Sequence, residues 1–363
     1  MTARTSSRGS VLLIVMVTLV GAVFALLIFA EKAGNDLLVE TKAADAIRLR
    51  REAYSALETV VSVLEEFRQA GNGLHSPAEG WANPLDFAGY TPRDGVKVAV
   101  SFEDESGKIS LPNADANLFV TVFKAWGASQ FDAERLSEAL MNWRAGGDSG
   151  RGPAPEDYGH ATIPYEAPQR SLRTFDELRA IDRARDFFYD EKGQPNDQWR
   201  RFVQVFSLYK FSQTNLNAAG AEVFAAYGID DNASVQALRD YLTGAGGYAR
   251  QGPQWLRSPA DAAALLGGQT VPAGFGVEIQ ALRVRVTVKQ GPSVFRLSAL
   301  ITPNNGGARA VGLSDLEKNK NETARTGVTA SPARPTEKNL KYPFTLLEIR
   351  ENDAPAESAG STP

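Results

Sequence analysis

The sequence predicts an α+β fold in which a long N-terminal helix packs on an antiparallel sheet, with a large all-helical domain inserted in the sheet. Three observations lead to this prediction. Residues 35–70 contain neither proline nor glycine, which favours one uninterrupted helix. Alternating apolar residues, typical of half-buried strands, occur near residue 96 and resume only after residue 277. The segment between carries helix start and stop signals instead.

The composition excludes several classes of protein. The chain has 363 residues, a net charge of −4 and no cysteine. This charge gives no bulk attraction for nucleic acid. Without cysteine there are no disulfides, thiolate metal sites or cysteine nucleophiles, and the 2 histidines leave little material for histidine-based catalysis.

An uncharged stretch near the N-terminus predicts a membrane anchor. Residues 11–30 form a run of 20 without charge, about the length that crosses a hydrocarbon core of roughly 30 Å. Arg4 and Arg8 precede it with no acidic residue between them, which predicts a cytoplasmic N-terminus. A secretory signal peptide has a shorter apolar region, about 7–15 residues, and a small-x-small end. The transmembrane part is therefore expected over residues 10–34.

The anchor is expected to continue into an amphipathic helix. One apolar stripe recurs at a spacing of seven residues and comprises Ile47, Tyr54, Val61, Leu57 and Leu64. The sequence Gly71-Asn72-Gly73 then ends the helix. A single rod from about Ser10 to Ala70 would be about 90 Å long at 1.5 Å per residue.

The sheet is predicted in two parts of the sequence. Alternation at Val96, Val98, Val100 and Phe102 indicates the first strand. Alternation resumes at Val277 and changes phase after Ala281, which predicts a bulge near Ala281-Leu282. Further strands are expected at 295–299 and 344–350. The sequence thus predicts a discontinuous α+β domain over residues 35–112 and 273–350.

The segment between the strands, residues 113–272, is predicted to be an inserted helical domain. Helix N-caps are expected at Ser129, at Thr174 with Glu177 three residues later, and at Ser258 before a proline. A further helix is expected within residues 217–228. Residues 303–340 and 351–363 are polar and are predicted to form a flexible insertion and a flexible tail.

Several short motifs resemble a known family, the minor pseudopilin K of type II secretion systems (general secretion pathway protein K). These motifs are "RGSVLL", "DESGKISLPNA", "LSEALMNWRAGGD", "TFDELRAI" and "QTNLNAA". The resemblance covers most of residues 8–350 and implies a pilin-like fold. It also implies that residues 1–9 are a prepilin leader, with Gly9 the last leader residue and Ser10 the first mature one.

The resemblance implies a structural role. A minor pseudopilin of this kind caps the pseudopilus tip and primes assembly for export of folded proteins across the outer membrane. Its implied partners are prepilin peptidase, which cleaves and methylates it, other minor pseudopilins of the I, J and H types, the major pseudopilin and secreted proteins. The implied location is the bacterial inner membrane, single-pass, with the bulk periplasmic. Most pilins carry a glutamate at mature position five, whereas this chain has Ile14 there, as a tip subunit would because an unpaired buried carboxylate is costly.

The family's helical domain binds calcium, which needs six to eight oxygen ligands. The candidate ligands here are Asp148, Glu156 and Asp157. The alternative is that these are solvated acidic side chains in a loop.

Two other functions remain open at this point. The first is a minor pilin of a type IV pilus, which neighbouring genes would distinguish. The second is a signal-anchored periplasmic serine hydrolase that uses Ser149 in "GGDSGRGP", with His75 and Asp104 completing a triad. The helix pairs near 174–182 and 213–228 resemble helix-hairpin-helix units, but acidic residues such as Asp176 and Glu222 argue against phosphate binding.

Overall fold

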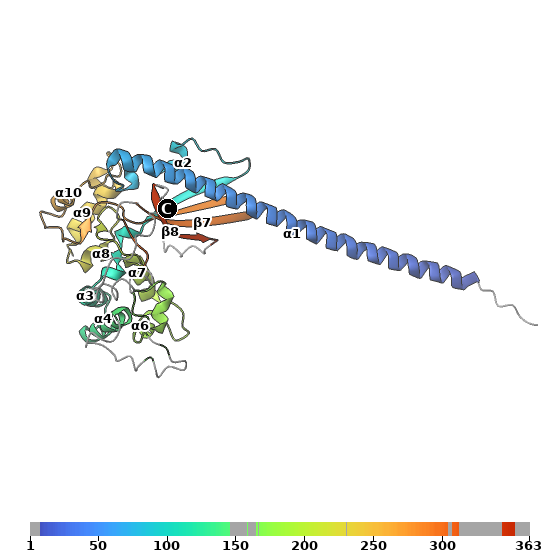
Figure 1. Ribbon diagram of the computed structural model, residues 1–363, viewed down its shortest axis with the longest axis horizontal. Coiled ribbons are helices and arrows are strands. Elements are labelled where there is room, and N and C mark those ends of the chain that lie inside the picture. Colours follow the sequence, from blue (N-terminus) through green and yellow to red (C-terminus); the bar gives the residue numbers. More distant parts are fainter. Residues whose placement is uncertain are drawn as a thin grey trace, which may run out of the picture.

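The computed structural model describes residues 8–145, 158, 165, 167–229, 231–303, 307–311 and 343–352. A single helix, α1 (Arg8–Gly71), runs unbroken for 64 residues. Its C-terminal half lies on a sheet, and its N-terminal half projects from the rest of the molecule (Figure 1). We call residues 12–46 of α1 the shaft and the described residues from 47 onward the head. The expected stop is confirmed, because Asn72 adopts a left-handed φ of 56° directly after the helix.

The sheet has four antiparallel strands in the order β1-β6-β7-β8. They are β1 (Lys97–Asp104), β6 (Leu282–Gln290), β7 (Ser293–Pro303) and β8 (Phe344–Glu351). The predicted split of the sheet is therefore confirmed. The predicted bulge near Ala281-Leu282 is wrong, since β6 begins at Leu282 and residues 277–281 form an irregular link. The observed irregularity lies between Leu300 and Ile301, where β7 pairs with β8.

The first hydrophobic core lies between α1 and this sheet. The helix contributes Leu49, Ala53, Ala56, Leu57, Val60 and Leu64, and the sheet contributes Val284, Val286, Val288, Leu297, Ala299 and Ile301. The predicted stripe is rotated slightly from this face. Leu57 and Leu64 are buried as expected, but Ile47 is 56% exposed. Two fully buried alanines, Ala53 and Ala56, occupy the centre of the face, so the helix approaches the strands closely there.

Short elements connect the two parts of the chain. After α1 come η1 (Pro77–Glu79) and α2 (Pro84–Phe87), and after β1 come η2 (Glu105–Gly107), β2 (Ile109–Ser110) and η3 (Leu111–Asn113). Leu74, Trp81 and Leu85 from the first group pack on the core between α1 and the sheet. The chain thus closes one side of α1 before it enters the sheet.

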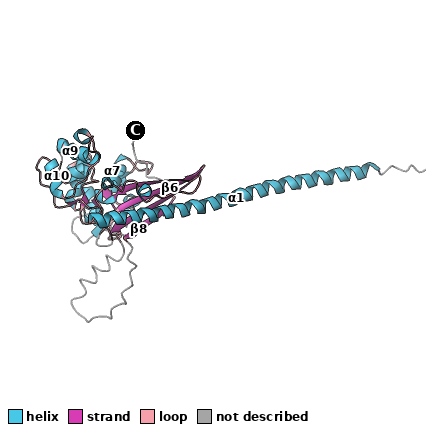
Figure 2. Cartoon of the chain, turned by 90° about the horizontal axis from the view of Figure 1, so that it is seen from above, coloured by secondary structure: helices cyan, strands magenta, loops and turns pink. Residues whose placement is uncertain are grey.

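The inserted segment is mainly helical and has its own core. Its helices are α3 (Ala116–Ala125), α4 (Gln130–Ala145), η5 (Phe175–Ala180), α6 (Ala184–Phe188), α7 (Asp197–Val205), α8 (Ala221–Ala226), α9 (Asn232–Thr243), η6 (Gly246–Tyr248) and α10 (Pro259–Leu265). Two short parallel strand pairs accompany them, β2 with β3 (Phe206–Ser207) and β4 (Thr214–Asn215) with β5 (Phe275–Gly276). Figures 1 and 2 show these elements gathered on the side of the head away from the shaft.

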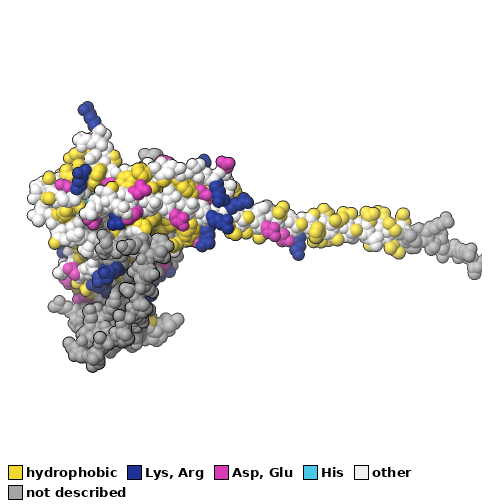
Figure 3. Space-filling model, turned by 45° about the horizontal axis from the view of Figure 1, so that its top comes forward, with side chains coloured by type: hydrophobic (Ala, Val, Ile, Leu, Met, Phe, Trp, Pro, Cys, Tyr) yellow, Lys and Arg dark blue, Asp and Glu magenta, His cyan; other side chains and the backbone are white. Residues whose placement is uncertain are grey.

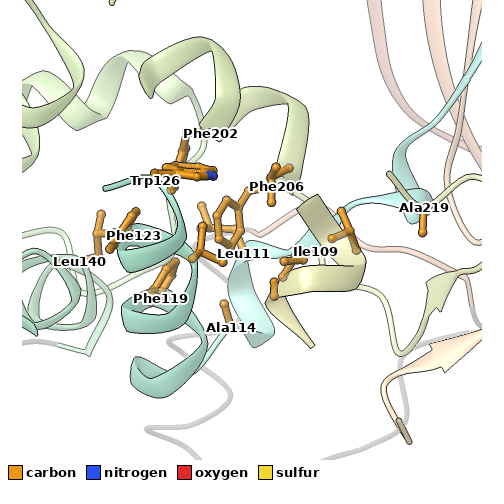
Figure 4. Close-up of a cluster of buried hydrophobic side chains, with 14 of the residues drawn as sticks. Ile109, Leu111, Ala114, Phe119, Phe123, Trp126, Leu140, Phe202, Phe206 and Ala219 are labelled. Atoms are coloured by element: carbon orange, nitrogen blue, oxygen red, sulfur yellow. The ribbon is translucent and has the colours of Figure 1, made fainter. Parts of the chain in front are cut away.

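Aromatic side chains fill the core of the insert. Phe123, Phe188, Phe202 and Phe206 are fully buried, and the ring centroids of Phe202 and Phe206 lie 4.6 Å apart. Figure 4 shows Phe119, Trp126 and Leu140 around the same cluster. Such ring pairs add to the free energy gained from burying apolar area. This core and the core beneath α1 share no buried residue.

The helix-capping signals in the insert are confirmed. The Ser129 hydroxyl accepts a hydrogen bond from the backbone N–H of Asp132 at 3.1 Å. Capping boxes form at Thr174 with Glu177 and at Ser258 with Asp261. The segments predicted to be flexible, 303–340 and 351–363, lie mostly outside the described residues.

Candidate assembly site

The shaft carries most of the exposed large apolar side chains of the described chain. Every side chain described from residue 12 to residue 37 is exposed, and Ile14 is 61% exposed. Figure 3 shows this apolar surface standing clear of the head. The helix is long and apolar enough to cross a membrane once. Within it the Thr18 hydroxyl donates to the carbonyl of Ile14 at 3.0 Å, so this polar group is satisfied inside the helix.

The structure describes some of the candidate site residues and not others. Gly9 and Ser10 lie in the first turn of α1. The proposed calcium ligands Asp148, Glu156 and Asp157 lie outside the described residues, as does Ser149. Among the residues that the structure describes, no group of three or more His, Asp or Glu side chains is placed to hold a metal ion. A calcium site therefore stays a prediction.

The triad of the hydrolase alternative is not assembled by its described members. The His75 Nδ1 atom lies 2.5 Å from Glu79 Oε1, and Glu79 Oε2 also accepts from Trp81 Nε1 at 3.0 Å. Asp104 makes its hydrogen bonds elsewhere, to Ser106 and Asn215. Asp104 therefore does not orient His75, as the triad requires.

Asp104 instead lies at the junction between the sheet and the insert. Its Oδ1 accepts from the Ser106 backbone N–H at 2.8 Å and from the Ser106 hydroxyl at 2.5 Å. Its Oδ2 accepts from Asn215 Nδ2 at 2.7 Å, and the same amide donates to the His75 carbonyl at 3.0 Å. The backbone N–H of Gln280 donates to the Ser106 hydroxyl at 2.9 Å. The Asp104 carboxylate thus links the loop after α1, the end of β1, the insert and the return to the sheet.

Burial raises the pKa of the Asp104 carboxyl to about 6, although the hydrogen bonds from Ser106 and Asn215 oppose this shift. The ionised form gives up its hydration when it is buried, and the hydrogen bonds replace only part of that loss. Protonation of Asp104 is therefore coupled to the stability of the junction.

Gly107 allows a second close contact at the junction. A Cβ atom on Gly107 would lie 2.7 Å from the Cβ of Ala218 and 2.8 Å from its carbonyl carbon and oxygen. Only glycine fits this approach without displacing the backbone. Two motifs of the sequence, "DESGKI" and "QTNLNAA", therefore meet in space through Asp104 with Asn215 and Gly107 with Ala218.

A network of charged side chains surrounds the junction. Lys108 Nζ lies 2.6 Å from Glu103 Oε1 and 3.2 Å from Glu105 Oε2, and Arg283 Nε lies 3.0 Å from Glu105 Oε1. Burial acts to raise the pKa of Glu103, but the charges of Lys108 and Arg285 lower it to about 2. A network of this kind fixes orientation more than it adds net stability.

Sequence reasoning missed the residues that hold this junction. The sequence alone predicts a role for Asp104 only in a triad, and it predicts none for Asn215 or Gly107. Both motifs contain small and amide residues, and this is the signal that could have indicated a close contact between them. A single sequence does not indicate which of these short segments contact one another.

Comparison with known proteins agrees with this architecture. Residues 101–191 match the family described as type II secretion system (T2SS), protein K. A chain from the crystal structure of the GspK-GspI-GspJ complex from the enterotoxigenic Escherichia coli type 2 secretion system is similar in fold, with a TM-score of 0.53 and 12% sequence identity. The similarity covers 87% of this chain and 98% of that chain. No curated protein matches the sequence significantly.

Proposed function

We propose, from the premise that this chain is a minor pseudopilin of the protein K family of type II secretion systems, that it caps the tip of the pseudopilus and primes its assembly. In this role it assembles with other minor pseudopilins and serves export of folded proteins across the outer membrane. It acts as a structural subunit and not as an enzyme. The family match over residues 101–191 carries the premise.

The single observation that best supports an assembly role is the form of α1. One continuous helix exposes all its described side chains over residues 12–37 and packs one face of its C-terminal part on the sheet. An ordinary anchor needs only the apolar 20 residues. Because the helix continues without interruption into the head, it fixes the position of the head relative to the membrane span. The proposed placement is single-pass in the bacterial inner membrane, with Arg4 and Arg8 on the cytoplasmic side.

Co-purification with partners tests the assembly role. The full chain is co-expressed with the I-type and J-type minor pseudopilins of its own secretion system and extracted from membranes. We expect all three to be recovered together. Recovery of the full chain alone, under conditions in which the I-type and J-type subunits still bind each other, would contradict the proposal.

The tip assignment rests on Ile14 at mature position five. With no subunit above this chain, no neighbouring ammonium is present to pair with a carboxylate at position 14. Ile14→Glu therefore leaves an unpaired carboxylate at bilayer depth. Insertion scales put that cost at about 2.5–3.5 kcal/mol. Ile14→Glu is expected to reduce assembly, and Ile14→Leu to leave it unchanged. Better assembly of Ile14→Glu would overturn the tip assignment while leaving the fold and family in place.

Calcium binding in the insert is a further part of the proposal and rests on the family resemblance alone. Asp148, Glu156 and Asp157 would supply carboxylate oxygens, the ligand type that calcium prefers. The melting temperature of the full chain is expected to fall when a chelator removes calcium, and Asp148→Asn is expected to reduce this response. Equal melting temperatures with and without calcium would remove this part of the proposal.

A minor pilin of a type IV pilus would share the helix and sheet. The match to T2SS protein K over residues 101–191 favours secretion. Genes for a secretin, a secretion ATPase and further pseudopilins beside this one would support the same choice.

A further inference from the structure

The face of the sheet opposite α1 is basic at one end. The valines of β6 are buried beneath α1, and side chains alternate between the two faces of a strand, so Lys289 lies on the opposite face. Lys97 pairs with Lys289 across β1 and β6, and directly opposite residues share a face. Arg296 lies on this face as well, because it pairs with Thr287, two residues before Lys289. We call these three exposed side chains, Lys97, Lys289 and Arg296, the basic face.

The basic face repels itself. Like charges directly opposite each other on a sheet are destabilising, and Lys97 and Lys289 form such a pair. Among the residues that the structure describes, no carboxylate pairs with either lysine or with Arg296, whereas neighbouring Arg285 pairs with Glu103. Lysine on an edge strand protects against aggregation, which accounts for Lys97 but not for two cations on the central strands β6 and β7. An external anion accounts for all three.

The basic face lies at the end of the sheet nearest the shaft. Beyond the far end of α1, the Ile279 N–H donates to the Leu74 carbonyl at 2.7 Å, so β6 starts there and runs back toward the shaft. Arg50 of α1 contacts Glu351 at the other end of the sheet. Figures 1 and 2 show the strands running along α1 toward the shaft. Lys289, the next-to-last residue of β6, therefore lies on the side of the head nearest the membrane span.

Helix and strand geometry gives the distance to the bilayer. Arg50 lies 20 residues beyond the uncharged run that ends at Ala30, about 30 Å along the helix. Lys289 is about 10 Å nearer the bilayer, since it lies three residues past Val286, which is level with Glu351 across β7. The remaining distance, about 20 Å for an upright helix, exceeds the headgroup layer of about 5–8 Å. A tilt of about 30–40° toward the sheet, within the range of membrane helices, brings the basic face within about 8 Å of the headgroups, one Debye length.

The surface of the anchoring bilayer fits this position. The chain has a net charge of −4, so a basic surface is a local departure. Basic side chains also gather where the shaft meets the head (Figure 3), and Arg48 and Arg51 of α1 are exposed there. Anionic phospholipids attract Lys and Arg close to a membrane surface. Because α1 tethers the head to the bilayer, the headgroups stay at short range, whereas an anion in solution does not.

We propose that the basic face binds anionic phospholipid headgroups, and that this contact makes the head lean toward the membrane on the side of the sheet. The inference rests on the proposed membrane placement and not on the role at the tip. The negative charge of the lipids offsets the repulsion between Lys97 and Lys289. The expected effect is about 100-fold in the ratio of leaning to upright heads, from roughly fivefold for each of the three side chains.

Energy transfer from the head to labelled lipid measures the lean. The chain has no cysteine, so Pro292→Cys, in the exposed turn between β6 and β7, gives one site for a donor dye in the full chain. Vesicles contain phosphatidylcholine alone or with about one third phosphatidylglycerol, and the acceptor is on a lipid headgroup. We expect a gain in transfer with phosphatidylglycerol, and loss of this gain at about 1 M salt, where the Debye length falls to about 3 Å. Equal transfer in the two lipid mixtures would overturn the inference.

Charge reversal identifies the residues responsible. The test variant combines Lys97→Glu, Lys289→Glu and Arg296→Glu, and it is expected to lose the gain in transfer. The matched control combines Lys124→Glu, Arg239→Glu and Arg250→Glu, at three exposed cations of the insert. It changes the net charge equally and is expected to keep the gain. Unchanged melting temperatures show that both variants are folded, and an equal loss of the gain in both would contradict a specific contact.

A single reversal separates lipid binding from stability. Lys97→Glu converts the like-charge pair with Lys289 into an opposite-charge pair, so the melting temperature in phosphatidylcholine is expected to rise. The gain in transfer is expected to fall, because the charge of the basic face drops from +3 to +1. A purely structural role would move stability without the lipid response, and that result would contradict the proposal.

Two other occupants of the basic face are outcomes of the same tests. Residues 353–363 carry Asp353 and Glu357, and they follow Asn352, whose N–H donates to the Arg296 carbonyl at 2.8 Å. A lipid response that appears only after deletion of these residues would assign the basic face to the chain's own tail. Loss of the I-type and J-type partners by the triple variant in detergent would assign it to a protein. Either result overturns the inference, whereas failure of the wild-type chain to recover partners contradicts the assembly role alone.

Discussion

The shaft and the head-bound part of α1 belong to one helix but have opposite surroundings. In the shaft, large side chains such as Leu26 and Phe29 are more than 60% exposed. In the head, Ala53, Ala56, Val60 and Leu64 are completely buried against the sheet. The difference shows that one helix serves two environments. Its first part exposes large apolar side chains all round, as the apolar interior of a bilayer favours, and its later part buries a single face, on which Ala53 and Ala56 let the strands approach.

This comparison predicts that the same substitution has different effects in the two parts. Leu64→Ala, in the head, is expected to lower the free energy of unfolding by about 2–5 kcal/mol, because it leaves a cavity in a packed core. Leu26→Ala, in the shaft, is expected to leave head unfolding unchanged. Urea unfolding of the full chain in detergent, followed by tryptophan fluorescence, measures both.

Arg51→Ala serves as a second control within the head, since Arg51 is exposed on α1. It is expected to change the free energy of unfolding by less than about 0.5 kcal/mol. Equal and small effects for Leu64→Ala and Arg51→Ala would contradict the packing described for α1.

Two glycine substitutions, one in the head and one in the shaft, test the same difference between the two parts. Gly107→Ala places a Cβ atom 2.7 Å from that of Ala218 and is expected to cost about 1–3 kcal/mol through overpacking. Gly34→Ala, where nothing lies within 4 Å, is expected to leave the head unaffected and to favour the helix by about 0.5–1 kcal/mol. Thermal unfolding of the two variants distinguishes these outcomes, and a Gly107→Ala protein as stable as wild type would refute the close contact at the junction.

A pH dependence of stability is expected from the junction in the head. The pKa of Asp104 is raised from 3.8 to about 6 in the folded chain. Between these values the folded state binds more protons than the unfolded state, so the free energy of unfolding rises as the pH falls. The expected contribution of Asp104 is about 1 kcal/mol between pH 7 and pH 5.

Asp104→Asn is the control for this titration. Its unfolding free energy is expected to lack that rise between pH 7 and pH 5. Below about pH 4.5 both proteins lose stability, because the pKa of Glu103 is lowered to about 2 and its ion pairs are lost on protonation. An identical pH profile for wild type and Asp104→Asn from pH 7 to pH 5 would show that Asp104 is not the responsible group.

Local patterns predicted most of the fold. The rod, its stop at Asn72, the split sheet and the caps at Ser129, Thr174 and Ser258 follow from residues close in sequence. The errors have a common cause in contacts that are distant in sequence. The buried face of α1 is set by strands that need small residues at Ala53 and Ala56, which a search for large apolar side chains misses. The apparent bulge at Ala281 is a link held by the junction, including the hydrogen bond from Glu105 N–H to the Ala281 carbonyl at 2.9 Å.

The candidate site was predictable only in part. The apolar span and the position of Ile14 are read directly from the sequence. The roles of Asn215 and Gly107 depend on two motifs about 110 residues apart meeting in space, as the hydrogen bond from Asn215 to Asp104 records.

Mass spectrometry of the mature N-terminus tests the central claim, assembly as a pseudopilin, most directly. The full chain is purified from membranes of a host that carries the prepilin peptidase. We expect a chain that begins at Ser10 with a methylated amine, and Gly9→Val is expected to retain the leader because a β-branched side chain replaces the glycine at the cleavage site. A mature chain that begins at Glu31, after loss of the whole apolar span, would contradict the claim.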